Sequence, residues 1–250
     1  MRISANIIVR NEEKKILRCL LSFKSIAEEI ILVHDGVCKD NTIRIAKEFG
    51  AKTFVKGYVG EAEPHRKFAI NKSSNDWILQ IDADEYLTPN LVKRIHKLIS
   101  DKYISGYYFK WNISFPGEKK KYDYKLALYR KSQISEFFGI PHESVKLFGK
   151  VIVLKNVELG HDRSGVTREQ FIHKSVVWPM LEGKYTARYK YKKIPIFLLP
   201  FGYVAYPFYR LFFQLLNGKI TNLKQAFENS FYAWRFWHSF CLIRFKEKFF

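Results

Sequence analysis

Residues 77–85 read WILQIDADE, so three acidic residues stand close together directly after an apolar run. The run is short, apolar and rich in residues that favour strands, which predicts a buried β-strand. Its acidic end is unexpected in a chain with a formal net charge of +19. An acidic cluster at the carboxyl end of a buried strand is typical of α/β sheets, in which ligands bind beyond the strand ends.

The segments around this strand alternate between two patterns. Short apolar runs predict strands at residues 4–9, 29–35, 51–55 and 76–81. Apolar residues at helical spacing predict helices at residues 12–23, 42–50, 64–73 and 89–99. We expect Asn11 to cap the first helix and either Asp40 or Asn41 to cap the second. The alternation predicts an α/β fold with a mainly parallel, Rossmann-like sheet and helices on both faces.

Two further regions depart from this alternation. Residues 106–159 hold several short β-like runs, which predict an antiparallel or mixed extension of the sheet. Residues 181–250 are basic and aromatic and are expected to form a helical tail beside a main domain of residues 1–180. The 3 Cys residues form no CxxC pair, which favours a reducing compartment over a disulfide or zinc framework. No secretory signal peptide is expected at the start of the chain.

The acidic cluster has the chemistry of a divalent-metal site. Two carboxylates at positions i and i+2 after a strand can converge on Mg²⁺ or Mn²⁺, which prefer oxygen ligands and keep positions open for phosphate and water. We expect Asp84 to bind the metal directly, and Asp82 to reach it through water or to bind the ribose of a nucleotide. Glu85 is expected to orient either of them. The structural alternative is an acidic surface turn without a ligand.

Several segments, in this order, resemble those of family 2 glycosyltransferases, which have the GT-A nucleotide-sugar-binding fold. The early ones are IIVRNEEKKILRCLLSF, LVHDGVCKDNT and EPHRKFAINKSSNDWILQIDADE. The later segments YDYKLALYR and GIPHESV resemble a branch that glycosylates lipopolysaccharide core and related envelope glycans. Together they cover about residues 3–160. The ordered set is more specific than any one segment, although similarity of fold alone does not establish function.

The resemblance implies roles for individual residues. Asp35 matches the acid that contacts the nucleotide base, and Asp82 and Asp84 match the family's D-x-D pair. Arg66 matches a basic position near the phosphates or the base of the donor. Glu143 stands where a carboxylate would serve as general base. The assignment of Glu143 as the base is weaker than the assignment of the metal ligands, because the usual Glu-Asp pair of the family is His-Glu in this sequence.

Four more residues are open between a functional and a structural role. By resemblance His161 is a further metal ligand, and His142 lies on the acceptor side. Asp123 and Arg130 either shape the acceptor or phosphate side or form an ion pair at a strand end. The family's Asp-Gly-Ser-Thr segment is altered to Gly-Val-Cys-Lys after Asp35, which weakens any inference about the bound base.

The reaction implied is displacement of a nucleoside diphosphate from the anomeric carbon of a sugar. A bound metal would neutralise the leaving diphosphate, and a carboxylate would take the proton of the acceptor hydroxyl. One base and no covalent intermediate imply inversion of configuration, through a transition state with oxocarbenium character. UDP is the favoured donor nucleotide, ahead of GDP and dTDP. The acceptor implied by resemblance is a lipid-linked or lipopolysaccharide-type glycan.

The tail combines a basic run with an aromatic segment. Residues 194–216 could span about 30 Å as a helix, enough for a bilayer, but Pro, Gly and Arg residues interrupt them. Tyrosines favour a membrane interface, and the basic run from residue 184 would meet anionic headgroups. We therefore expect residues 184–216 to lie on, or re-enter, the cytoplasmic face of a membrane, making the protein peripheral. The alternatives are a dimer contact or a cap on the core of the main domain.

Three other functions compete with this interpretation. A nucleic-acid-binding protein would explain the charge and the aromatic residues, but not the acids at a strand end. A nucleotidyltransferase can share the sheet and the metal acids, but usually carries an N-terminal Gly-rich phosphate loop, where this chain has VRNEEKK. A third alternative is a catalytically inactive scaffold with the same fold, which only a measured enzymatic activity would exclude. We expect no nucleic-acid partner.

Overall fold

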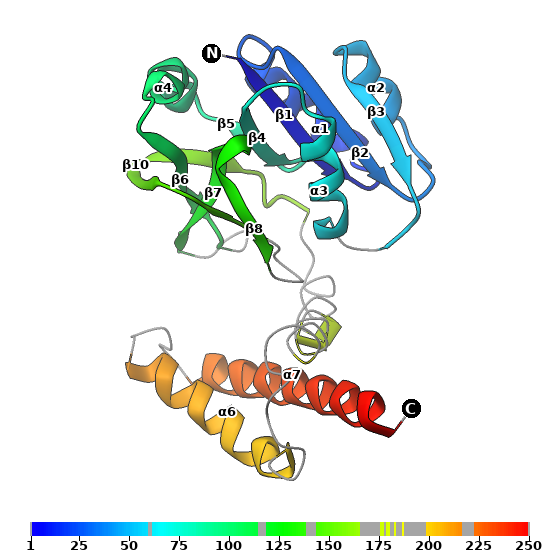
Figure 1. Ribbon diagram of the computed structural model, residues 1–250, viewed down its shortest axis with the longest axis vertical. Helices are drawn as coiled ribbons and strands as arrows, with labels where there is room; N and C mark the ends of the chain where they lie inside the picture. Colours follow the sequence, from blue (N-terminus) through cyan, green and yellow to red (C-terminus); the bar gives the residue numbers. More distant parts are fainter. Residues whose placement is uncertain are drawn as a thin grey trace. The chain divides into compact units, whose positions relative to one another are not determined.

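The computed structural model describes most of the chain. The described residues are 2–59, 62–114, 119–138, 144–165, 176–177, 179–180, 183, 187, 199–216 and 223–249. Contacts within the chain divide it into two compact units, residues 1–138 with 143–165, and residues 139–142 with 166–250. The first unit contains the sheet, and the second contains the helices α6 and α7 (Figure 1).

The first unit is built on one large mixed sheet with the strand order β3-β2-β1-β4-β7-β6-β10-β5 (Figure 1). Its strands are β1 (Ile3–Val9), β2 (Glu29–Asp35), β3 (Lys52–Lys56), β4 (Trp77–Asp82), β5 (Glu85–Leu87), β6 (Ile104–Asn112), β7 (Tyr122–Arg130) and β10 (Lys150–His161). The first four strands in sequence pair in parallel, as predicted. Beyond β4 the sheet is mixed, because β7 runs antiparallel to both β4 and β6 while β10 runs parallel to β6. The predicted mixed extension is therefore confirmed.

Helices cover both faces of this sheet. They are α1 (Glu13–Phe23), α2 (Thr42–Glu48), α3 (Glu63–Lys72) and α4 (Pro89–Ser100), with a 3-10 turn at Lys131–Gln133. Along β1, Ile7 packs into the core shared with α1, α2 and α4, whereas Ile8 faces the core shared with α3. This alternation is the period of two expected for a strand buried on both sides.

A short antiparallel hairpin, β8 (Ile134–Phe138) and β9 (Ser144–Leu147), extends the α3 face. Ile70 of α3, Ile78 of β4, Tyr129 of β7 and Val145 of β9 form one buried cluster. The hairpin therefore covers β4 and β7 where α3 ends, so the sheet is buried on this side as well.

The first helix does not begin as predicted. Asn11 has a φ of +52°, a left-handed conformation that Asn tolerates better than most residues, and its Oδ1 accepts a hydrogen bond from the Lys39 N–H at 2.8 Å. The α1 helix starts two residues later, and the prediction of Asn11 as its cap was wrong. Asp40 instead accepts hydrogen bonds from the N–H groups of Glu13 and Thr42, at 3.1 and 2.9 Å. One carboxylate thus serves the amino ends of both α1 and α2, where the helix dipoles favour it.

The second unit contains a pair of packed helices, α6 (Leu199–Leu216) and α7 (Leu223–Phe249). Gly202 lies so close to Trp237 that an added Cβ would come within 1.9 Å of its indole ring. The Tyr206 ring stacks on Phe236 and Trp237, with centroid distances of 5.0 and 5.4 Å. Among the described helices, none combines the length and the hydropathy that crossing a bilayer requires.

The amino end of the sheet is held by a buried carboxylate, that of Glu29. It accepts hydrogen bonds from Ser4 Oγ, from Lys52 Nζ at 2.7 Å and from the Ser74 N–H at 2.8 Å. Burial acts to raise the pKa of Glu29, but these bonds more than offset it and lower the pKa to about 2, from an ordinary value of 4.5. The ionised form is therefore the one that the fold stabilises.

Replacing Glu29 by Gln should lower the free energy of unfolding by about 2 kcal/mol at pH 7. Because the pKa is depressed in the folded state, this contribution is present above pH 4.5 and is lost as the pH falls toward 2. Urea unfolding of both proteins at pH 7 and at pH 3 measures it. Glu48→Gln, at an exposed ion pair with Arg44, is the control and should change little at either pH. An equal gap between wild type and Glu29→Gln at both pH values would contradict the assignment.

Candidate active site

The pairing of β1 brings two predicted acids to the same edge of the sheet. Val9 pairs with His34 on one side, directly before Asp35, and Ile8 pairs with Asp82 on the other. Asp35 and Asp82 are the last residues of β2 and β4. Since all three strands are parallel, both carboxylates stand at the carboxyl edge, where ligands of open α/β sheets bind.

The turn between β4 and β5 holds the acidic cluster in a fixed conformation. Glu85 Oε2 accepts a hydrogen bond from the Asp82 N–H at 2.9 Å, and the Asp84 carbonyl accepts one from the Asp162 N–H at 2.7 Å. Strand β5 pairs with the end of β10, which sets His161 opposite Glu85. The side chains of Asp82 and Asp84 are 30% and 31% exposed, whereas that of Glu85 is fully buried. Of the three carboxylates, those of Asp82 and Asp84 are thus partly exposed to solvent.

A lysine that the sequence analysis did not single out lies in the middle of this cluster. Lys125 Nζ, from β7, lies 2.6 Å from Asp82 Oδ2 and 2.7 and 2.6 Å from the two oxygens of Glu85. The antiparallel pairing of β4 with β7, in which Leu79 lies opposite Leu128, directs the earlier residues of β7 toward the carboxyl end of β4. Burial alone would lower the pKa of Lys125, but the two carboxylates raise it instead. The ammonium is therefore charged.

The pKa values of the two acids that Lys125 binds are shifted in opposite directions. Burial acts to raise the pKa of Asp82, yet Lys125 and Arg66 hold it well below its usual range. Arg66 Nη2 lies 3.6 Å from Asp82 Oδ1. Burial raises the pKa of Glu85 to about 7, although Lys125 pulls it down. Asp82 is thus an anion shared between two cations, and Glu85 is the buried support of the turn.

Asp84 has a different partner, His161. His161 Nε2 lies 3.4 Å from Asp84 Oδ2, while Nδ1 lies 2.7 Å from the Asn112 carbonyl oxygen. A carbonyl only accepts, so Nδ1 carries the hydrogen and Nε2 turns its lone pair, or a second proton, toward Asp84. The imidazole stacks on Trp111 at 4.6 Å, which fixes its plane. A lone pair and a carboxylate facing each other at this distance suit a cation between them.

The donor set at this point is small. Within the described part of the chain, no group of three or more His, Cys, Asp or Glu side chains is placed to hold a metal. Asp84 and His161 supply one oxygen and one nitrogen. Mg²⁺ and Mn²⁺ sites with one or two protein ligands take their remaining ligands from substrate phosphates and water. The pair therefore fits a divalent ion that binds together with a phosphorylated substrate.

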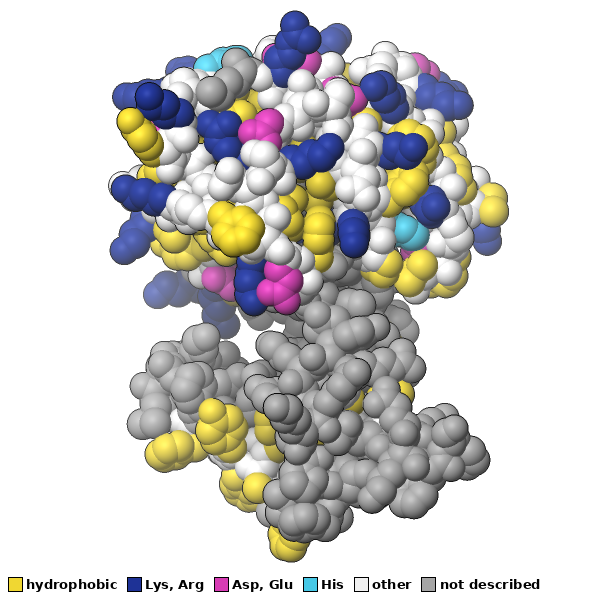
Figure 2. Space-filling view, viewed as in Figure 1, with side chains coloured by type: hydrophobic (Ala, Val, Ile, Leu, Met, Phe, Trp, Pro, Cys, Tyr) yellow, Lys and Arg dark blue, Asp and Glu magenta, His cyan; other side chains and the backbone are white. Residues whose placement is uncertain are grey.

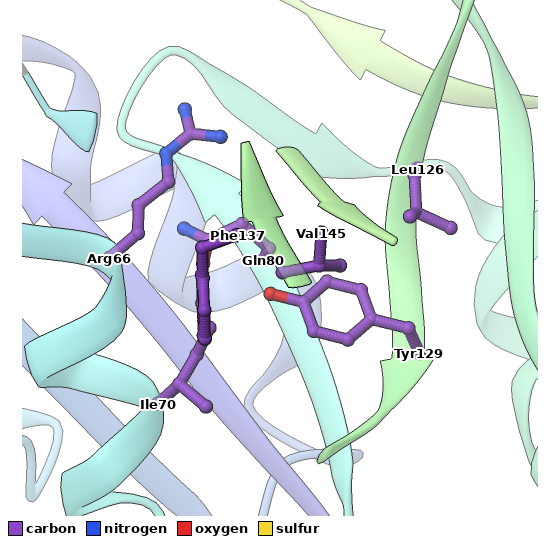
Figure 3. A pocket seen from close by; sticks show the side chains of 7 residues that line it. All are labelled: Arg66, Ile70, Gln80, Leu126, Tyr129, Phe137 and Val145. Atoms are coloured by element: carbon purple, nitrogen blue, oxygen red, sulfur yellow. The ribbon is translucent and has the colours of Figure 1, made fainter. Parts of the chain in front are cut away.

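Arg66 of α3 also lines a small cavity on the α3 face (Figure 3). The cavity is lined by Arg66, Ile70, Gln80, Leu126, Tyr129, Phe137 and Val145. In Figure 3 the Tyr129 ring points from β7 toward Gln80 and Phe137. The cavity has a volume of about 20 Å³, enough for about one water molecule. Ordinary ligand pockets have volumes of several hundred Å³. This cavity is therefore too small for a ligand of ordinary size.

Asp35 is buried and bound within the protein. Its Oδ1 lies 2.9 Å from His65 Nε2 and accepts a hydrogen bond from the Val59 N–H at 2.7 Å. Next to it, Arg10 stacks over the Tyr58 ring at 4.0 Å and donates to the Tyr58 hydroxyl at 2.8 Å. His65 was not singled out from the sequence, because only the fold brings α3 to the end of β2. The role of Asp35 at a nucleotide base stays a prediction.

Asp123 and Arg130 make contacts outside the acidic cluster. Asp123 is exposed, and its carboxylate accepts from the Tyr124 N–H at 2.8 Å. Arg130 pairs with Asp76 at 3.2 Å and stacks over Trp77, at the amino end of β4. For Arg130 this geometry favours the ion pair at a strand end. His142 and Glu143 lie outside the described residues, so their roles stay predictions.

Comparison with known proteins identifies the family of this chain. Residues 4–153 match the family model described as "Glycosyl transferase family 2". The chain belongs to glycosyl transferase family 2. A protein of Rickettsia typhi named "Uncharacterized glycosyltransferase" is 34% identical over 195 residues, which is 70% of this chain and 64% of the relative. A Rickettsia bellii protein with the same name is also 34% identical over 194 residues, again 70% and 64% of the two chains. The predicted family is thus confirmed. The chain spans 64% of the length of these relatives.

Solved structures show the same fold at low sequence identity. The mannosyltransferase PcManGT from Pyrobaculum calidifontis, in complex with GDP-Man and Mn²⁺, is 12% identical with a TM-score of 0.54, covering 98% of this chain and 86% of that chain. S. aureus TarS 1–349 in complex with UDP is 12% identical with a TM-score of 0.51, covering 99% and 91%. These similarities support the GT-A-like fold class.

The buried bonds of Asp35 lead to a test of its structural role. Asp35→Ala removes the acceptor of His65 and Val59, and should lower the free energy of unfolding by about 2 kcal/mol. Asp35→Asn keeps an acceptor oxygen and should lower the free energy of unfolding by less than Asp35→Ala does. Asp123→Asn, on an exposed side chain, is the control and should stay within about 0.5 kcal/mol of wild type. Urea unfolding measures all three variants, and equal stabilities for Asp35→Ala and Asp123→Asn would contradict the assignment.

Proposed function

We propose that this chain transfers a sugar from a nucleoside-diphosphate donor to a hydroxyl group of a glycan acceptor, with inversion at the anomeric carbon. The observation that carries the proposal is the pair Asp84 and His161 at the carboxyl edge of a family 2 fold, beside an Asp82 already held by cations. UDP is the favoured nucleotide. The structure of TarS with UDP supports this choice. The structure of PcManGT with GDP-Man and Mn²⁺ keeps GDP as the second candidate and supports a divalent metal.

In this proposal the residues at and around the acidic turn bind different parts of the donor. Asp84 Oδ2 and His161 Nε2 would hold Mn²⁺ or Mg²⁺, whose charge would neutralise that of the leaving diphosphate. Arg66 adds a positive charge beside Asp82, on the side from which a phosphate would approach. Asp35 and the Arg10–Tyr58 pair lie at the end of β2, where the resemblance places the base. Glu143 is the proposed acceptor of the proton from the glycan hydroxyl.

A thermal-shift panel tests the donor site. UDP, GDP, dTDP and CDP are each added with and without Mn²⁺, and a nucleotide at 100 times its Kd should raise the Tm by about 5 °C or more. We expect UDP to act, and only with the metal. Asp84→Asn should abolish the shift, whereas Glu48→Gln, at an exposed ion pair on α2, should keep it. A wild-type protein whose Tm responds to no nucleotide with or without Mn²⁺ would contradict the donor site.

We also propose that α6 lies on an anionic membrane surface and that the acceptor is a lipid-linked or lipopolysaccharide-type glycan. Phe201, Phe208 and Phe212 recur at spacings that place them on one stripe of α6, and they are 70%, 68% and 64% exposed. This stripe differs from the one that carries Gly202 and Tyr206 against α7. In Figure 2 hydrophobic side chains project from the described part of the second unit, and Lys and Arg are spread over the visible face of the first.

Charge complementarity supports a membrane as the partner of this stripe. The segment before α6 carries the basic residues Lys184, Arg188, Lys190, Lys192 and Lys193. Basic residues attract anionic headgroups, while aromatic side chains settle at the interface. A helix with such an apolar stripe can lie in the plane of the interface without crossing the bilayer.

Sedimentation of the full chain with lipid vesicles tests this surface. Wild type should bind vesicles containing phosphatidylglycerol at least about tenfold more tightly than pure phosphatidylcholine vesicles, and salt should weaken the binding. Phe208→Ser with Phe212→Ser should reduce it by about tenfold or more. Phe148→Ser, on a Phe of the first unit that is 65% exposed, is the matched control and should bind as wild type. If the double variant binds vesicles normally but dissociates a dimer, the stripe is a contact between two copies.

A further inference from the structure

Lys125 connects β7 to the acidic turn through three short contacts. Its ammonium lies within 2.7 Å of Asp82 Oδ2 and of both Glu85 oxygens, and its side chain is only 13% exposed. Lys125 Nζ also lies over the Trp111 ring, 5.5 Å from its centroid. Trp111 is also the ring on which His161 stacks. Lys125 is therefore built into the same group of side chains as the proposed metal ligands.

This placement removes two carboxylates from the ligands that a metal could use. Asp82 Oδ2 and both Glu85 oxygens already accept the charged hydrogen bonds of Lys125. Asp82 Oδ1 faces Arg66 at 3.6 Å. A cation that took Asp82 as a direct ligand would have to displace an ammonium held in a buried, low-dielectric position, which is costly. Among the described residues of this cluster, Asp84 and His161 stay available, and two ligands are too few to bind Mg²⁺ or Mn²⁺ tightly by themselves.

We propose that Lys125 is a positioning residue that makes metal binding depend on the donor diphosphate. This inference rests on the proposed donor site at Asp84 and His161. Without donor, Lys125 occupies Asp82 and adds a positive charge next to the metal position, so the metal binds weakly. With donor, the diphosphate supplies the missing oxygens and negative charge, so metal and nucleotide bind together. Such coupling is reciprocal, and each ligand raises the affinity of the other by the same factor.

Removing the ammonium should reverse this dependence. Lys125→Met keeps most of the volume and the apolar stem but frees Asp82, so that two carboxylates, those of Asp82 and Asp84, are available to the metal. We expect Mn²⁺ to bind this variant about tenfold or more tightly than wild type in the absence of nucleotide. The factor by which UDP tightens Mn²⁺ binding should fall correspondingly, because part of what the diphosphate supplied is already present. Lys125→Arg retains a cation and should behave like wild type.

The measurement is a titration of the full chain with Mn²⁺, followed by calorimetry or by the paramagnetic resonance of free Mn²⁺, with and without UDP. Lys110→Met is the matched control, because it removes one charge from the paired strand β6, where Lys110 lies over the Tyr122 ring at 3.8 Å. It should leave both affinities unchanged. Circular dichroism and the Tm of each variant establish that it is folded.

Lys125→Met leaves the buried Glu85 without its counter-charge and can destabilise the fold, because breaking one partner of a buried pair is costly. The double variant Lys125→Met with Glu85→Gln removes both charges of that pair. Gln keeps an oxygen that can accept from the Asp82 N–H, so the turn retains its hydrogen bond. Asp82 is still released, and this variant should also bind Mn²⁺ more tightly than wild type without UDP.

Three results are distinguishable. Tighter Mn²⁺ binding without UDP in either Lys125→Met variant, together with a smaller effect of UDP, supports the proposal. Unchanged Mn²⁺ affinity and unchanged coupling in the folded variants overturn the role of Lys125 while leaving the donor site in place. A wild-type protein that binds neither Mn²⁺ nor UDP overturns both the donor site and the inference that rests on it.

Discussion

The geometry of the site depends on β1, a strand buried along its entire length and hydrogen-bonded on both edges. A slip of one residue would move its apolar side chains from one core to the other. Polar groups also fix the register: Asn6 Oδ1 accepts from Ser73 Oγ at 2.8 Å, and Ser4 Oγ donates to Glu29. A slip would leave these buried groups without partners, at a cost of about 1–3 kcal/mol each. The fixed register is what sets Asp35 and Asp82 at the same edge.

Beyond that edge, burial divides three neighbouring carboxylates into different roles. Glu85 is fully buried and supports the turn, Asp82 is shared between Lys125 and Arg66, and Asp84 faces His161. Their proximity would be strongly repulsive without the two cations, because like charges in a poorly hydrated site destabilise one another. The acidic cluster is therefore compatible with the +19 net charge of the chain, because two of its basic side chains, Lys125 and Arg66, lie beside the clustered carboxylates.

The parallel half of the fold could be predicted because its signals are local. The predicted strand at residues 29–35 coincides with β2, and the predicted helix at residues 64–73 differs from α3 by one residue at each end. The acids at the strand ends follow from that topology. Lys125 and His65 could not be predicted, because their positions depend on an antiparallel register and on where α3 crosses the sheet. No pattern in the sequence encodes either. Asn11 was assigned wrongly because a cap and a left-handed turn favour the same residue types.

Strand β10 makes the acidic turn depend on a distant part of the chain. The family match ends at residue 153, inside β10, but the residues that close the turn, His161 and Asp162, follow that boundary. The residues that close the turn thus follow the acids in the chain by the length of α4, β6, β7, the β8–β9 hairpin and β10. Insertions or deletions in the loops of this intervening region can be tolerated as long as β10 returns to pair with β5. The loops of this region could therefore change within the family while the β5–β10 pairing that closes the acidic turn is preserved.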